Sequence, residues 1–149
     1  MSPIQRTSID LARDRSRGIE ALRGTGVPAV FCDLVRVQMS ECALLFVSGM
    51  VATDETGKVT ARTMREQTRI VLDKIRRALE HEGAAMDDVV RVRVYVTQLD
   101  QATLRDIHEV RSGYFTEGRY PASTLVRVDQ LIRDGALIEI DADAVVATR

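Results

Sequence analysis

A segment near the end of the chain alternates apolar and polar residues, and the rest of the sequence can be interpreted around it. Leu137, Glu139, Asp141 and Asp143 fall on one face of an extended chain, and Ile138, Ile140, Ala142 and Ala144 fall on the other. This period of two predicts a strand within 135–146 that packs one face on apolar cover. Its other face carries three acids, which must meet water, basic neighbours or a ligand.

Two longer segments place apolar residues at steps of three and four, as amphipathic helices do. The first runs from about Ala61 to Glu82, where Gly83 ends it. The second spans about Gln101–Phe115 and begins after Asp100, a residue type that caps helices. The predicted core positions are Met64, Thr68, Val71, Leu72, Ile75 and Leu79, then Leu104, Ile107, Val110 or Arg111, and Tyr114 or Phe115.

Further strands are predicted at Val30–Val37, at Leu44–Val51, at Val89–Thr97 and at the end of the segment 119–128. In the Val89–Thr97 strand, Val90, Val92, Val94 and Val96 share one face. Ser48-Gly49 interrupts the second strand, and a glycine inside a strand marks a bulge or a close backbone approach. The order β-β-α-β-α-β-β predicts an α+β fold, a sheet with two helices packed on one face.

Residues 1–27 are interpreted as an N-terminal extension, and residues 28–149 as a single domain. Within the extension, Ser8 would cap a short helix over Ile9–Leu22, which has a thin apolar stripe. No chemistry is expected there.

Composition excludes several classes of function. The chain has 149 residues, a net charge of −1 and 4% aromatic residues, so nucleic acid is not an expected partner. No apolar run approaches the roughly 20 residues of a membrane span, and the first residues lack a signal-peptide core, so a cytoplasmic location is expected. The two cysteines, Cys32 and Cys42, form no CxxC, and the two histidines lack ligand spacing, so no metal is expected.

Two arginines offer partners for two of the acids. Arg91 and Arg93 would lie beside Asp141 and Asp143 if their strands are neighbours, as opposite charges across a sheet do. Glu139 is left without an explanation of this kind.

A set of short motifs occurs in a specific order. They are Leu45-Phe46-Val47-Ser48-Gly49, Glu66-Gln67-Thr68, Asp87-Asp88-Val89-Val90-Arg91-Val92 with Tyr95-Val96-Thr97, Tyr114-Phe115, Pro121-Ala122, and Gly135-Ala136-Leu137-Ile138-Glu139-Ile140. With these motifs, residues 28–147 resemble the RidA/YjgF family of reactive-intermediate deaminases. The resemblance implies a chorismate-mutase-like subunit and a homotrimer with clefts between subunits. It also implies cofactor-free and metal-free chemistry, in which a glutamate at Glu139 holds the water that attacks an imine carbon.

The chain departs from the deaminating members at three places. Their arginine directly after Pro-Ala, which grips the substrate carboxylate, is Ser123 here. Their tyrosine before the second strand has no counterpart in Cys32–Val35, and a frequent asparagine of the second helix aligns with His108. A hydroxyl offers one donor and no charge, so weak or absent activity on ordinary 2-imino acids is expected.

Two hypotheses follow for the cleft. In the first, the protein is an enzyme that hydrates or deaminates a small imine or enamine, with Glu139 as general base or water-orienting group. Ser48 and Gly49 would complete its cleft, and the substrate-binding candidates are Ser123, Thr124, the backbone at Leu125, His108 and Arg127. For His108 and Arg127, a surface or ion-pairing role is the alternative. In the second, a non-catalytic trimer binds a small metabolite as a sensor or carrier. An endoribonuclease has no support in the charge or the aromatic content.

Overall fold

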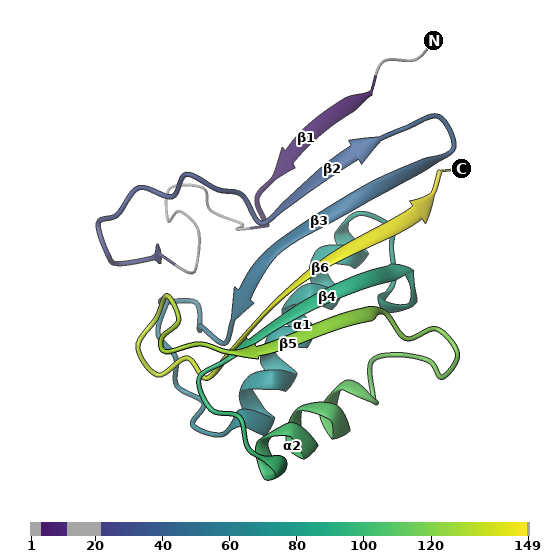
Figure 1. The fold of residues 1–149 in the computed structure, drawn as a ribbon. Coiled ribbons are helices and arrows are strands. Elements are labelled where there is room, and N and C mark those ends of the chain that lie inside the picture. Colours follow the sequence, from purple (N-terminus) through teal and green to yellow (C-terminus); the bar gives the residue numbers. More distant parts are fainter. Residues whose placement is uncertain (1–3, 12–21, 149) are drawn as a thin grey trace.

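The computed structural model describes residues 4–11 and 22–148, which form one mixed sheet with two helices on the same face (Figure 1). The elements are β1 (Gln5–Ile9), β2 (Leu34–Gln38), β3 (Cys42–Val51), α1 (Met64–His81), a 3₁₀ turn (Met86–Asp88), β4 (Val89–Val96), α2 (Gln101–Arg111), β5 (Ala122–Arg127) and β6 (Ile138–Ala147). The predicted α+β fold is confirmed.

The closing strand β6 lies at the centre of the sheet, whose order is β1-β2-β3-β6-β4-β5. Neighbouring strands are antiparallel except β4 and β5, which are parallel. The apolar face of β6 is fully covered by the helices: Ile138, Ile140, Ala142 and Ala144 are at most 1% exposed. The predicted alternation is therefore confirmed, and the acids lie on the open face of the sheet.

The start of the chain differs from the prediction. Ser8 and Ile9 lie in β1, which pairs with β2, so the helix predicted to begin there is wrong. The rest of that helix, residues 12–21, lies outside the described part of the chain. The edge of β2 offers backbone partners to the residues before Asp10, and this pairing decides their conformation against a weak helical preference. The sheet consequently has one strand more than predicted.

Both helices begin at a side-chain cap: Asp100 is the cap predicted for α2, and Thr63 caps α1, which begins at Met64, later than the predicted Ala61. Thr63 Oγ1 accepts a hydrogen bond from Glu66 N, and Asp100 Oδ1 accepts one from Thr103 N. Every predicted core residue of α1 is buried. Helix α2 ends at Arg111, earlier than predicted, and Leu104 is 39% exposed, so its assignment to the core is wrong. Both Val110 and Arg111 are buried.

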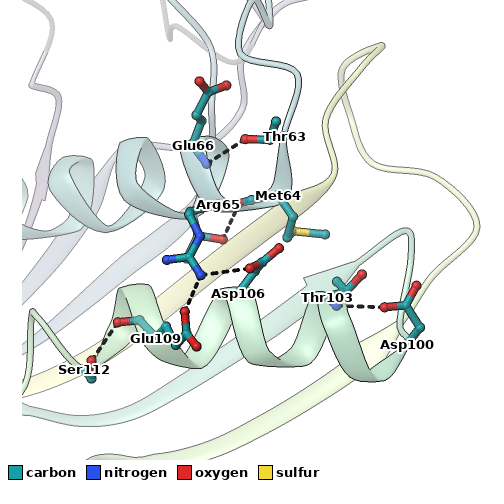
Figure 2. A network of polar contacts seen from close by, with 10 residues as sticks. Thr63, Met64, Arg65, Glu66, Asp100, Thr103, Asp106, Glu109 and Ser112 are labelled. Atoms are coloured by element: carbon teal, nitrogen blue, oxygen red, sulfur yellow. Dashed lines mark hydrogen bonds and ion pairs between the residues drawn. The ribbon is translucent and has the colours of Figure 1, made fainter.

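An arginine joins the two helices on their outer side. Arg65 of α1 reaches Asp106 of α2 at 2.9 Å and also pairs with Glu109, as Figure 2 shows. These contacts fix α2 against α1 and thereby set the position of the opposite side of α2, which faces β5.

Strand β4 contains an irregularity that the alternation alone does not predict. Its register with β6 shifts between Val89 and Arg91. Val90 is therefore 50% exposed, although it was predicted on the covered face, and Val89 is buried in its place.

The predicted ion pairs between β4 and β6 are made by one arginine. Arg93 Nη1 lies 2.8 Å from Asp141 Oδ1, and its Nη2 lies 3.1 Å from Asp143 Oδ2. Arg91 lies opposite Asp143 in the register, but it makes no ion pair within the described residues. A fork that spans two carboxylates fixes the polar face of β6 beside Glu139.

Candidate functional site

The Ser48-Gly49 interruption of β3 is a bulge, as predicted. The register of β3 with β6 shifts between Val47 and Met50. Ser48 holds the bulge to the segment before β2: its N donates to Asp33 O at 2.9 Å, and its Oγ donates to Cys32 O at 2.7 Å. The hydroxyl proton of Ser48 is thus engaged by the backbone, and its oxygen can still accept a hydrogen bond from a ligand.

Glu139 lies directly against the second residue of this bulge. A Cβ built on Gly49 would fall 2.8 Å from Glu139 Cδ and 3.1 Å from both its Cγ and its Oε2. The carboxylate therefore occupies the space that any side chain at position 49 would need. The close approach, and not the backbone conformation, which is ordinary, favours glycine here, because a side chain would have to push the flexible Glu139 carboxylate aside.

The Glu139 carboxyl is half-buried, and no hydrogen bond or ion pair joins it to another of the described residues. Burial raises its pKa above the ordinary glutamate value, and the negative charge of Asp141 raises it further. A carboxylate that is half-buried, without a partner and more basic than usual suits the role of a general base.

Gly49→Ala is expected to lower any activity that depends on Glu139 by about 100-fold, because the added methyl group displaces the carboxylate by more than reacting groups tolerate. Turnover and the melting temperature should be measured together. Gly113→Ala is the matched control, since a Cβ there meets only Val110 O at 3.5 Å. Equal turnover in the Gly49→Ala variant and the parent would show that the contact has no catalytic consequence.

A second group of predicted residues lines a pocket between the end of α2 and the start of β5. The pocket has a volume of about 350 Å³ and is lined by His108, Arg111, Ser112, Phe115, Tyr120, Pro121 and Ser123. His108 and Ser123, two of the predicted substrate-binding residues, therefore line the same pocket. Arg111 is the residue that sequence reasoning missed as a site residue: it was named only as an alternative to Val110 for the core. The available signal was a cation at a core position of a helix.

The register of β5 places the remaining candidates. Ser123 is paired with Val92, whose side chain is in the core, and Thr124 is paired with Arg93 on the open face. Since side chains alternate along a strand, Ser123, Leu125 and Arg127 point to the helix side, and Thr124 points to the side of Glu139. Arg127 shares the face of Ser123, as expected, but its exposed guanidinium lies 3.9 Å from Asp129 and is not part of the pocket lining.

Within one chain the candidates thus form two separate half-sites on opposite faces of the sheet. We call them the carboxylate half-site (Glu139, Ser48 and Gly49) and the arginine half-site (the pocket lined by Arg111, His108 and Ser123). No group of three His, Cys, Asp or Glu side chains that could hold a metal ion occurs in residues 4–11 and 22–148. Over the same ranges, no helix is long and apolar enough to cross a membrane.

The fold and these half-sites can be compared with known proteins. The model of a family described as Endoribonuclease L-PSP matches residues 30–146. A crystal structure of a YjgF family member from Mycobacterium tuberculosis is similar over 95% of this chain and 100% of its own, with a TM-score of 0.69 and 30% identity. The chain belongs to the RidA/YjgF family.

Three relatives show what members of the RidA/YjgF family are named for. A RutC family protein of Pyrococcus abyssi is 40% identical over 67% of this chain and 76% of its own. A 3-aminoacrylate deaminase of Acinetobacter baylyi is 35% identical over 65% and 75%. A 2-iminobutanoate/2-iminopropanoate deaminase of Salmonella typhimurium is 31% identical over 69% and 80%. The names of the last two relatives thus state their substrates, which are one enamine and two imines.

Proposed function

We propose that this RidA/YjgF protein adds water to a small imine or enamine, without a cofactor, and releases ammonia from the product. The observation that carries the proposal is the half-buried Glu139 carboxylate, which lies on Gly49 and has no partner among the described residues. In its charged form it would accept a proton from a water molecule as that water attacks the C=N carbon. That proton would pass to the nitrogen, and the carbinolamine would lose ammonia as its hydroxyl proton also moves to nitrogen, which leaves a carbonyl compound. An enamine would first tautomerise to the imine, with a proton moving from its nitrogen to its β-carbon.

The same proposal includes a homotrimer with the cleft between subunits. The two half-sites face opposite sides of the sheet, so a neighbouring chain is needed to bring a carboxylate half-site against an arginine half-site. The open face also carries apolar side chains that a partner would cover: Phe46 is 42% exposed, Val126 41% and Val145 38%. In a closed ring of identical subunits, each carboxylate half-site would face the arginine half-site of the next subunit, and no half-site would be left without a partner.

The class of substrate follows from the named relatives and from one difference. Relatives at 31% and 35% identity are named for two imines and for 3-aminoacrylate. Ser123 provides no cationic fork at the position directly after Pro-Ala, so the ordinary 2-imino acids whose carboxylate an arginine grips there should react slowly. Thr124, the backbone at Leu125 and the His108 ring would bind the polar groups of the preferred substrate.

The test is a substrate panel applied to the purified chain. Imines generated in place by an amino acid oxidase, and 3-aminoacrylate, should lose their C=N or enamine absorbance faster with protein than in buffer. Ammonia release should match that loss. No acceleration for any member of the panel would overturn the proposal. Saturable binding of the corresponding stable carbonyl compounds without turnover would instead favour the non-catalytic metabolite-binding trimer.

A further inference from the structure

Arg111 is a buried cation without a partner. Its side chain lies on α2 with the residue 8% exposed, and its Nη1 atom has no hydrogen-bond partner among the residues that the structure describes. Within the same ranges, no ion pair or side-chain hydrogen bond engages its guanidinium. Buried charges in proteins are normally paired, because an unpaired one forfeits its hydration without compensation. An unpaired buried guanidinium therefore indicates an anion that the isolated chain does not supply.

Two other arginines, which join elements of the fold, form ion pairs with carboxylates of the same chain. Arg65 has Asp106 and Glu109, and Arg93 has Asp141 and Asp143. Arg111 differs because, among the described residues, no Asp or Glu lines its pocket. The chain thus supplies carboxylates to Arg65 and Arg93 and leaves Arg111 buried at the wall of a pocket without one.

The surroundings of Arg111 in the pocket are mixed in polarity. His108 lies one turn earlier on α2 and lines the same pocket. Burial lowers the pKa of Arg111, and burial together with the charge of Arg111 lowers the pKa of His108. Ser123 adds a hydroxyl donor, Ser112 Oγ donates to Glu109 O and keeps only acceptor capacity, and Phe115 and Pro121 provide apolar walls. A volume of about 350 Å³ lies at the small end of the range for ligand pockets.

We propose that Arg111 binds the carboxylate of a small, short-chain carboxylic acid in this pocket and supplies the charge that Ser123 lacks. The inference rests on the proposed function and narrows it, since it makes the substrate a carboxylate-bearing imine or enamine. The ligand's carboxylate would then lie against α2, where Arg111 is, and not against β5, where Ser123 is. A small residue at position 123 leaves the α2 side of the pocket accessible. The reactive carbon is consequently held at a different place than in relatives whose arginine follows Pro-Ala.

Binding can be measured without turnover. Calorimetry on the full chain would use propionate, 2-oxobutanoate, inorganic phosphate and the neutral isostere propionamide. The carboxylates should bind saturably, and propionamide, which has the same shape without the charge, should bind at least about tenfold more weakly. Phosphate binding as tight as that of the carboxylates would indicate a general anion site and overturn the assignment to a carboxylate. Arg111→Gln should weaken carboxylate binding about 10- to 100-fold, as expected for the loss of a charged hydrogen bond. Arg105→Gln removes the same charge from an exposed position of the same helix and should leave binding unchanged.

A second readout keeps the test decisive if Arg111→Gln folds poorly. Arg111→Lys retains the charge without the fork and should bind carboxylates at an intermediate affinity. In addition, the imidazole protons of His108, followed by NMR, should show a higher pKa when a carboxylate is bound in the parent protein. Equal carboxylate affinity in the parent and Arg111→Gln would overturn the inference, as would the absence of any carboxylate binding to the folded parent.

The inference and the proposed function can fail separately. Turnover of an uncharged enamine with no response to Arg111→Gln would retain the function and reject this assignment. Carboxylate binding that depends on Arg111 without turnover of any substrate would do the reverse.

Discussion

Glu139→Gln is expected to reduce turnover about 100- to 10,000-fold, the range for removing a positioned general base. The amide has the same shape, so it still fits against Gly49, but it cannot accept a proton from water at the pH of the assay. Initial rates on the best substrate of the panel, at saturating concentration, measure the effect. The substitution is not expected to destabilise the protein at pH 7: folding raises the pKa of this carboxyl, so its charged form costs the fold free energy above the unfolded pKa.

Controls for this variant lie on the same strand. Asp143→Asn removes an identical charge from the same face of β6, at one of the two carboxylates of the Arg93 fork, and should retain most of the activity. Asp141→Asn should move the rising limb of the pH–rate profile to lower pH, because the charge of Asp141 raises the pKa of Glu139. The base acts when deprotonated, so activity should be lost as the pH falls through that pKa. Equal rates for Glu139→Gln and Asp143→Asn would remove Glu139 from the mechanism.

Gln67→Leu is expected to lower the free energy of unfolding by about 2 to 5 kcal/mol, since it leaves several backbone groups without a partner. The Gln67 side chain is fully buried. Its Nε2 donates to Ala61 O at 2.9 Å and to Gly135 O at 2.8 Å, and its Oε1 accepts from Leu137 N at 2.8 Å. One amide thus ties the start of α1 to the segment that leads into β6 and its Glu139.

Denaturant unfolding of the two proteins under the same conditions measures this effect. Gln98→Leu is the matched control: that glutamine is exposed and bonds only Asp100, so its replacement should change the free energy of unfolding by no more than about 0.5 kcal/mol. If the free energy of unfolding of Gln67→Leu also stays within about 0.5 kcal/mol of the parent value, the prediction is contradicted. Water would then satisfy the three backbone groups that Gln67 contacts.

The periodic elements could be predicted from the sequence, and the elements that depend on distant partners could not. Helix α1 and strand β6 follow their own hydrophobic patterns, and the predicted faces are the buried ones. Strand β1 forms because β2 offers it an edge, and the bulge at Val90 depends on pairing with β6. No local pattern carries either kind of information.

The residues of the candidate site also differ in whether the sequence could predict them. Glu139 and Ser48-Gly49 could be named from motifs, and the bulge itself from a glycine inside a strand. Arg111 could not be assigned to a pocket, because its meeting with Ser123 depends on how α2 packs over β5. At helical spacing, an arginine beside Val110 is as consistent with a surface position as with a buried one.

Under the proposed function, the placement of the two half-sites on opposite faces of one sheet would make activity depend on the protein concentration. A single chain would carry both half-sites without being able to bring them to one substrate. In the proposed homotrimer, dilution below the assembly's dissociation constant would switch the chemistry off while each chain remained folded. Trimers assembled from two different variants should regain activity. In a trimer that contains chains without Glu139 and chains without Arg111, some clefts would combine an intact carboxylate half-site with an intact arginine half-site, so mixing the two impaired proteins should restore turnover.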